Sequence, residues 1–82
     1  MKLPRDLSGH DLAKALTSLG YKPVRQRGSH LTLTTRQSGE HHVTIPLHDP
    51  LKSGTLNAIL RDLAEHHRID RSALLMTLLS KS

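Results

Sequence analysis

The chain has 82 residues, and its twelve lysines and arginines against seven acidic residues give a net charge of +5 with neutral histidines. It lacks cysteine, which excludes disulfides, thiolate metal sites and a cysteine nucleophile. We expect one domain over 1–82, with no signal peptide and no membrane span, because the apolar runs are too short. The positive charge favours a polyanionic partner. The absence of cysteine is compatible with a reducing cytoplasm, where we expect the protein to be located.

Residues 8–19 predict the first helix. Ser8 and Asp11 have the spacing of a capping box, in which each side chain accepts a hydrogen bond from the other residue's backbone. Gly20 stands where a left-handed cap would end the helix. The apolar residues that recur at helical spacing and form one face are Leu12, Ala15, Leu16 and Leu19.

Three short strands are predicted next, over 21–26, 30–35 and 41–46. Pro23 lies in the first and indicates an edge or irregular strand. Alternation should leave one apolar face for the helices to cover and one polar face. The residues expected on the apolar face are Val24, Leu31, Leu33, Val43 and Ile45. Those expected on the polar face are Arg25, His30, Thr32, His42 and Thr44.

Two further helices complete the predicted fold. The first spans 54–66 with Ser53 as its candidate cap, and the second spans 70–79 with Asp70 as its cap. The element order indicates an α+β fold with a three-stranded antiparallel sheet. This α-β-β-β-α layout, with a core over about 8–67, is like that of double-stranded RNA-binding domains, extended by the C-terminal helix.

The stretch 25–30 between the first two strands reads Arg-Gln-Arg-Gly-Ser-His. Gly28 is expected to adopt a positive φ in a hairpin turn, which leaves His30 at the start of the second strand. An imidazole exchanges a proton near neutral pH, and guanidinium groups bind phosphate oxygens. These residue types form a minimal set for attack on a phosphodiester. The alternative interpretation of His30 is an ordinary solvated strand histidine.

Five segments carry, in their order and spacing, a resemblance to a known family: LTSLGY at 16–21, RQRGSH at 25–30, VTIP at 43–46, His48 just after, and GTLNAIL at 54–60. The chain resembles the HicA-type toxins, the small ribonucleases of HicA–HicB toxin–antitoxin pairs. The resemblance implies a metal-independent mRNA interferase, with the histidine of the Gly-Ser-His motif as catalytic residue. It also implies a HicB-type antitoxin that covers the active site, and an oligomer formed through that complex.

The expected mechanism is attack of a ribose 2′-hydroxyl on the adjacent phosphate, which requires RNA. His30 would take a proton from that hydroxyl or give one to the leaving oxygen. Ser29 would supply a hydroxyl or a backbone donor. His48 and His42 are candidates for a supporting role, although His48 also fits a loop histidine bonded to nearby backbone. The cations expected to bind phosphate or stabilise its charge are Lys22, Arg25, Arg27 and Lys52.

Two pairs of adjacent histidines raise the question of a metal site. Neighbouring strand residues point to opposite faces, so His41 and His42 should not share an ion. His66 and His67 should diverge similarly on their helix, where metal-binding pairs are typically four residues apart. We therefore expect neither a metal nor a cofactor.

Two other functions fit the same composition. A non-catalytic double-stranded RNA-binding module would use the basic surface without cutting RNA, and a basic protein-interaction domain would bind an acidic partner. His30 on the polar face favours the enzyme. The C-terminal segment is more apolar than one helix stripe requires, which core packing and a contact with the antitoxin or a second copy would explain. Its apolar residues are Leu74, Leu75, Met76, Leu78 and Leu79.

Overall fold

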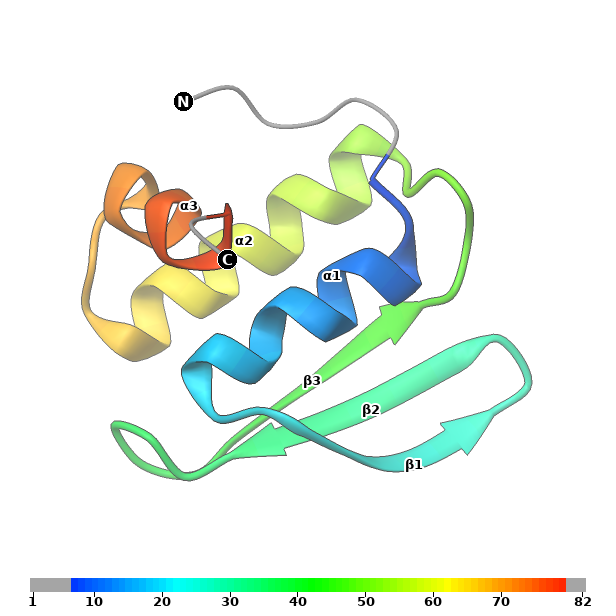
Figure 1. Ribbon diagram of the computed structural model, residues 1–82, viewed down its shortest axis with the longest axis horizontal. Coiled ribbons are helices and arrows are strands. Elements are labelled where there is room, and N and C mark those ends of the chain that lie inside the picture. Colours follow the sequence, from blue (N-terminus) through cyan, green and yellow to red (C-terminus); the bar gives the residue numbers. More distant parts are fainter. Residues whose placement is uncertain (1–6, 80–82) are drawn as a thin grey trace.

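The computed structural model describes residues 7–79, which form a three-stranded sheet with a layer of helices on one side (Figure 1). In chain order the elements are α1 (Gly9–Ala15), the 3₁₀-helix η1 (Leu16–Leu19), β1 (Lys22–Arg27), β2 (His30–Thr35), β3 (His41–Pro46), α2 (Ser53–His67) and α3 (Arg71–Leu79). This order confirms the predicted α+β fold, with the α-β-β-β-α layout and an additional C-terminal helix. Within the described residues, no helix combines the length and the apolar character needed to cross a membrane.

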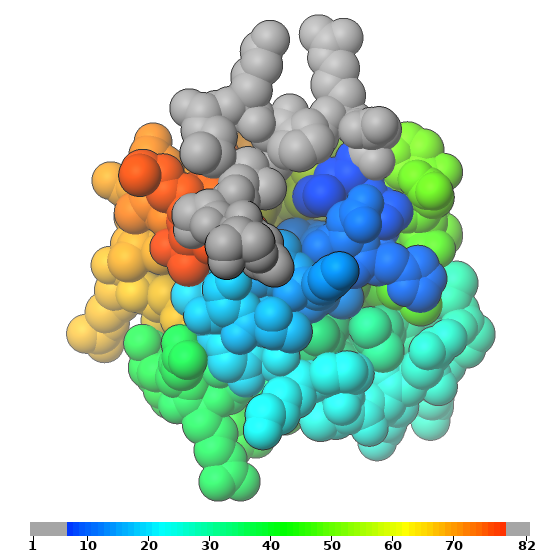
Figure 2. Space-filling view, viewed as in Figure 1, coloured from blue at the N-terminus to red at the C-terminus, as the bar shows by residue number. Residues whose placement is uncertain are grey.

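The sheet is antiparallel throughout, with β2 in the centre and β1 and β3 at its edges. α1 and α2 both contact β3, while α3 contacts α2 and η1. The helices therefore cover one face of the sheet, mainly over β3, and the β1–β2 hairpin extends beyond them (Figure 1). In Figure 2 this hairpin, coloured cyan to teal, forms the lower right margin of the molecule.

The first helix begins with the predicted capping box. The Ser8 hydroxyl accepts a hydrogen bond from the Asp11 backbone N–H at 3.0 Å, and the Asp11 carboxylate accepts one from the Ser8 N–H at 3.4 Å. The helix tightens into a 3₁₀ turn at Leu16, whereas a continuous helix was expected over 8–19. Gly20 ends the segment with a φ of 81°, the left-handed conformation predicted for it.

Strand β1 departs from regular alternation at Val24. Pro23 pairs with Leu33 and Arg25 pairs with Thr32, so Val24 is the extra residue of a β-bulge. Its side chain is 60% exposed, and the prediction that it faces the core is wrong. The prediction of an irregular edge strand at Pro23 is confirmed. Arg25 still lies on the polar face because it pairs with Thr32.

The two later helices begin differently. Asp70 caps α3 as predicted, since its carboxylate accepts a hydrogen bond from the Ala73 N–H at 2.8 Å. The predicted cap of α2 is wrong, because Lys52 occupies the N-cap position and Ser53 is already the first helical residue. The Lys52 side chain makes no capping hydrogen bond. The helix α2 is therefore stabilised mainly by the packing of its own apolar face.

The core lies between the sheet and the helices and is aliphatic apart from Tyr21. In α3, Leu74 and Leu78 are buried, whereas Met76 is 59% exposed. Core packing thus accounts for part of the apolar character of α3; the side chain of Leu79 lies outside the described part of the chain. The buried core residues are Leu12, Ala13, Leu16, Leu19, Tyr21, Leu33, Val43, Ile45, Leu51, Leu56, Ile59, Leu60, Leu63, Leu74 and Leu78.

Candidate nucleic-acid interface and active site

The polar face of the sheet carries three cross-strand rows of side chains. Each row joins one residue of β1, one of β2 and one of β3 through the pairing register. The β1 member of every row is a cation, and none of these nine residues is acidic. Neighbouring side chains in a row start about 5 Å apart, so each cation lies beside its β2 partner. The rows are Arg27, His30 and Pro46; Arg25, Thr32 and Thr44; and Lys22, Thr34 and His42.

His30 begins the central strand, and the hairpin turn positions it. Gly28 has a φ of 54° at the first position of the two-residue loop, as predicted and as type II′ hairpins favour. The Ser29 carbonyl accepts a 2.6 Å hydrogen bond from the Leu47 N–H, which ties the turn to the segment after β3. His30 is exposed and pairs with Arg27. An imidazole and a guanidinium group are therefore presented to solvent side by side.

The other predicted phosphate-binding residues lie at different distances from His30. Successive rows are roughly 7 Å apart along the strands, so Arg25 lies one row from His30 and Lys22 lies two. Ser29 is exposed in the turn directly before His30. Lys52 is exposed at the N-cap of α2, in the helix layer and not on the polar sheet face. The fold thus gathers the β1 cations beside His30 and leaves Lys52 apart from them.

His48 lies at the same end of the sheet as His30, two residues beyond the strand partner Pro46. Its backbone carbonyl accepts a 2.9 Å hydrogen bond from the N–H of Gly9, at the start of α1. A side chain on Gly9 would collide with the Pro46 carbonyl, so α1 begins in close contact with the end of β3. The His48 side chain is exposed. A supporting role for this imidazole stays a prediction.

His42 does not lie beside His30. It pairs with Thr34, four residues along β2 from His30, which is roughly 13 Å at about 3.3 Å per residue. Its imidazole contacts the Thr34 hydroxyl at 2.6 Å and the Glu40 carboxylate at 3.0 Å. His42 lies on the predicted face, but the strand register separates it from His30.

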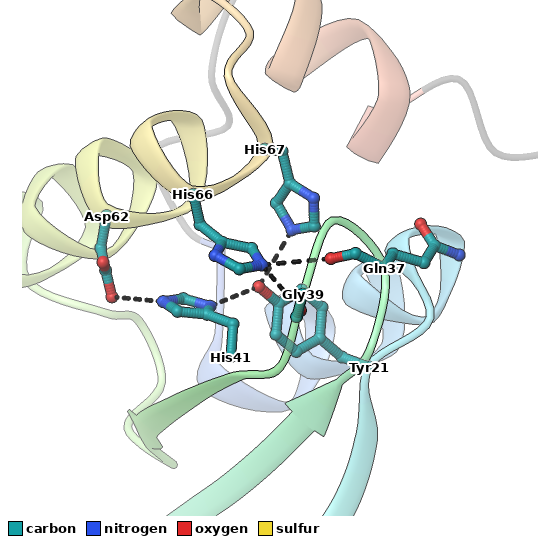
Figure 3. Close-up of polar contacts among 7 residues, drawn as sticks. All are labelled: Tyr21, Gln37, Gly39, His41, Asp62, His66 and His67. Carbon is teal, nitrogen blue, oxygen red and sulfur yellow. Dashed lines mark hydrogen bonds and ion pairs between the residues drawn. The ribbon is translucent and has the colours of Figure 1, made fainter.

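A polar cluster that the sequence did not predict surrounds the buried Tyr21, at the start of β3 and the end of α2 (Figure 3). The Tyr21 hydroxyl lies 2.6 Å from His41 Nδ1 and 3.0 Å from His67 Nε2. His41 Nε2 lies 3.2 Å from the Asp62 carboxylate. His66 stacks on His41 with ring centroids 4.2 Å apart. We call these five residues the tyrosine–histidine cluster.

The cluster connects α2 to the sheet and to the β2–β3 turn. The His66 Nε2 donates to the carbonyl oxygens of Gln37 and Gly39, at 3.1 and 3.0 Å. Burial raises the pKa of Tyr21 to about 12, and the Asp62 carboxylate adds to this shift. Burial also lowers the pKa of His67, to which the nearby His66 and His41 contribute. At neutral pH the cluster therefore holds a protonated phenol beside a neutral His67.

The two histidine pairs behave differently. His41 and His42 point to opposite faces as predicted, with side chains 15% and 58% exposed. His66 and His67 were expected to diverge, but their ring centroids lie 4.7 Å apart, because both turn toward β3 and Tyr21. In residues 7–79, no three or more His, Cys, Asp or Glu side chains are arranged to hold a metal ion. The histidines here contact the phenol, a carboxylate and backbone carbonyls instead.

The layout and the open basic sheet face define a small basic α+β protein with the fold layout of double-stranded RNA-binding domains. Residues 9–64, more than half of the chain, match the family model described as the HicA toxin of bacterial toxin–antitoxin. The chain belongs to this family, and it is therefore a toxin that pairs with an antitoxin. No curated protein and no solved structure matches the chain significantly. The match includes all three rows of the polar face, while α3 lies outside it.

Proposed function

We propose that this toxin is a metal-independent endoribonuclease, an mRNA interferase, in which His30 is the general acid or base. The observation that carries the proposal is the position of His30, exposed at the start of the central strand and paired with Arg27. A phosphate bound at this end of the sheet would meet a proton-transfer group and a charged hydrogen-bond donor together. The cations of the next two rows extend the same positive surface.

The reaction is an in-line attack of a ribose 2′-oxygen on the adjacent phosphorus. A bond forms between these two atoms while the bond from phosphorus to the 5′-oxygen breaks, which gives a 2′,3′-cyclic phosphate and a 5′-hydroxyl. His30 takes the proton of the 2′-hydroxyl or gives a proton to the leaving 5′-oxygen. Solvent takes up or supplies the other proton. One positioned imidazole raises the reaction rate by a factor on the order of 10²–10⁴.

Charge builds up on the phosphate oxygens during this attack, and Arg27 is placed to stabilise it. Its guanidinium group starts from the strand position directly opposite His30. Preorganised donors of this kind stabilise a transition state because they need no reorientation as the charge develops. Arg25, one row away, is placed to hold the next phosphate of the strand. Ser29 adds a hydroxyl in the turn, and Lys52 lies outside this group because it belongs to the helix layer.

A HicB-type antitoxin inhibits this activity by covering the polar face of the sheet. The β1 cations and His30 on that face are exposed in the toxin alone. A partner that presents acidic groups to these cations excludes RNA and leaves the enzyme inactive. The oligomer forms through this complex, and the pair acts in the cytoplasm, where its mRNA substrate is found.

The experiment that tests the proposal compares RNA with DNA of the same sequence. Purified toxin is incubated with each labelled strand in excess chelator at low salt. We expect RNA to be cut and DNA to stay intact, because the reaction needs a 2′-hydroxyl and no metal. Intact RNA that is retained by the protein would identify a non-catalytic RNA-binding module. No RNA binding at moderate salt would identify a basic protein-interaction domain, and either result overturns the proposal.

A further inference from the structure

A shallow hollow lies at the end of the polar face farthest from His30. It is lined by Gly20, Lys22, Val24, Thr34 and Arg36. Thr34 is four residues from His30 along β2, so the hollow lies roughly 13 Å away. That length corresponds to about four stacked nucleotides at roughly 3.4 Å each, and to fewer in an extended strand.

The side chains around the hollow combine the two features that bind a nucleotide. Lys22 and Arg36 are exposed cations, and among residues 7–79 neither forms an ion pair. Val24 supplies apolar surface, since the β-bulge turns it outward and leaves it 60% exposed. The cations suit a phosphate, and the apolar patch suits a ribose or the face of a base.

A line of positive charge connects this hollow with His30. The edge strand β1 places Arg27, Arg25 and Lys22 on the same face in three successive rows. Their β2 partners are uncharged or basic, so no carboxylate within the rows interrupts the path. A polyanion that follows the edge of the sheet therefore passes from the imidazole to the hollow over a continuous cationic surface.

We propose that the hollow is a remote nucleotide subsite, which holds one nucleotide of a single RNA strand two to four positions away from the phosphate at His30. The inference rests on the proposed ribonuclease function. It adds to that function the direction in which the RNA strand runs from His30 and the number of nucleotides that the protein binds. Recognition is by phosphate charge and apolar contact, because Tyr21, the one aromatic residue of the chain, is buried and unavailable for stacking. The alternative role of this edge, protection against strand pairing, requires no RNA contact.

Glu40 makes the charge balance of the subsite testable. Its carboxylate contacts the His42 imidazole at 3.0 Å, and His42 in turn contacts Thr34 in the wall of the hollow. A negative charge at this margin opposes a bound phosphate. Removing it by Glu40→Gln should tighten RNA binding about two- to threefold, in the direction opposite to the loss of a cation.

The test measures the affinity of labelled RNAs from two to ten nucleotides long, with the full chain carrying His30→Ala so that RNA stays intact. In this background we expect affinity to rise in a step once the RNA is long enough to reach the hollow. Adding Lys22→Ala and Arg36→Ala should remove the step, with a loss of about 10- to 30-fold on the longer RNAs, because two phosphate contacts are lost. The control pair, Lys14→Ala and Arg61→Ala, removes two exposed cations of the helix layer with the same change in net charge.

The outcomes separate the subsite from the nuclease. Equal affinities for the test pair and the control pair overturn the subsite, as does an equal loss on the shortest and the longest RNAs. In the protein with His30 intact, the test pair should raise KM for long RNA by a larger factor than KM for a dinucleotide, which is too short to reach the hollow. A toxin that cuts RNA without this length dependence retains the nuclease function and refutes only the subsite. A toxin that shows the step without cutting RNA refutes only the nuclease.

Discussion

His30→Ala should lower the rate of RNA cleavage by about 10²–10⁴-fold, the usual contribution of one positioned acid or base. The loss should appear in kcat, because the imidazole acts on the transferred proton and contributes little to holding the strand. His30 is exposed, so its removal should leave the folded structure and the melting temperature nearly unchanged. Initial rates on a defined RNA in chelator, with thermal unfolding as the check of the fold, give the measurement.

The matched control for this variant is His10→Ala, which removes an exposed histidine from the helix layer at the start of α1. We expect that protein to cut RNA at the wild-type rate. His30→Ala should also keep its salt-dependent RNA binding, because the β1 cations remain. A His30→Ala protein that cuts RNA or arrests growth like the wild type would remove this histidine from the mechanism.

Tyr21→Phe should destabilise the fold by about 1–3 kcal/mol, although only one oxygen atom is lost. The phenol is 1% exposed, and its hydroxyl contacts both His41 Nδ1 and His67 Nε2. Without that hydroxyl, two ring nitrogens at the edge of the core lose a partner that water replaces poorly. The measurement is denaturant unfolding at pH 7, with the slope of the transition checked against the wild type.

The same cluster should limit stability at both ends of the pH range. Because the pKa of His67 is lowered in the folded protein, this histidine binds a proton more readily in the unfolded chain. The contribution of His67 to stability is therefore complete above about pH 6.5 and is lost as the pH falls below that value. The pKa of Tyr21 is raised to about 12, so stability is retained up to about pH 10 and falls as the pH rises from there toward 12. Unfolding free energies measured across this range should give a plateau between the two limits.

A variant of each titrating group separates the two limbs of this profile. His67→Gln should flatten the acid limb, and Tyr21→Phe should flatten the alkaline limb. The exposed His10→Gln should leave both limbs as in the wild type. An acid limb that is unchanged in His67→Gln would show that other groups cause the loss of stability, and the assigned role of the cluster would be wrong.

The local features of the fold were predictable because they depend on residues close in sequence. The capping box at Ser8, the left-handed glycine at Gly20 and the Asp70 cap each need partners within a few residues. Alternation placed His30 on the polar face, since period two is a property of the strand itself. The function was predicted from motif order and not from these features.

The errors arise where alternation or local spacing gives no information about register or packing. One extra residue at Val24 resets the alternation of β1, and nothing in its neighbours marks the bulge except Pro23. His42 shares a face with His30 but not a row, because the turn between β2 and β3 sets the register. The tyrosine–histidine cluster joins residues up to 46 positions apart, such as Tyr21 and His67, so only tertiary packing reveals it.

In the proposed reaction the RNA's own 2′-hydroxyl attacks the phosphorus, and His30 moves a proton in that attack. The most direct measurement maps a cleavage site in RNA and then repeats the reaction on the same strand with a single 2′-deoxynucleotide on the 5′ side of that bond. We predict that cutting there stops, that other sites are still cut, and that unmodified RNA yields a 2′,3′-cyclic phosphate. Cleavage at the deoxynucleotide at an undiminished rate would contradict attack by the 2′-hydroxyl.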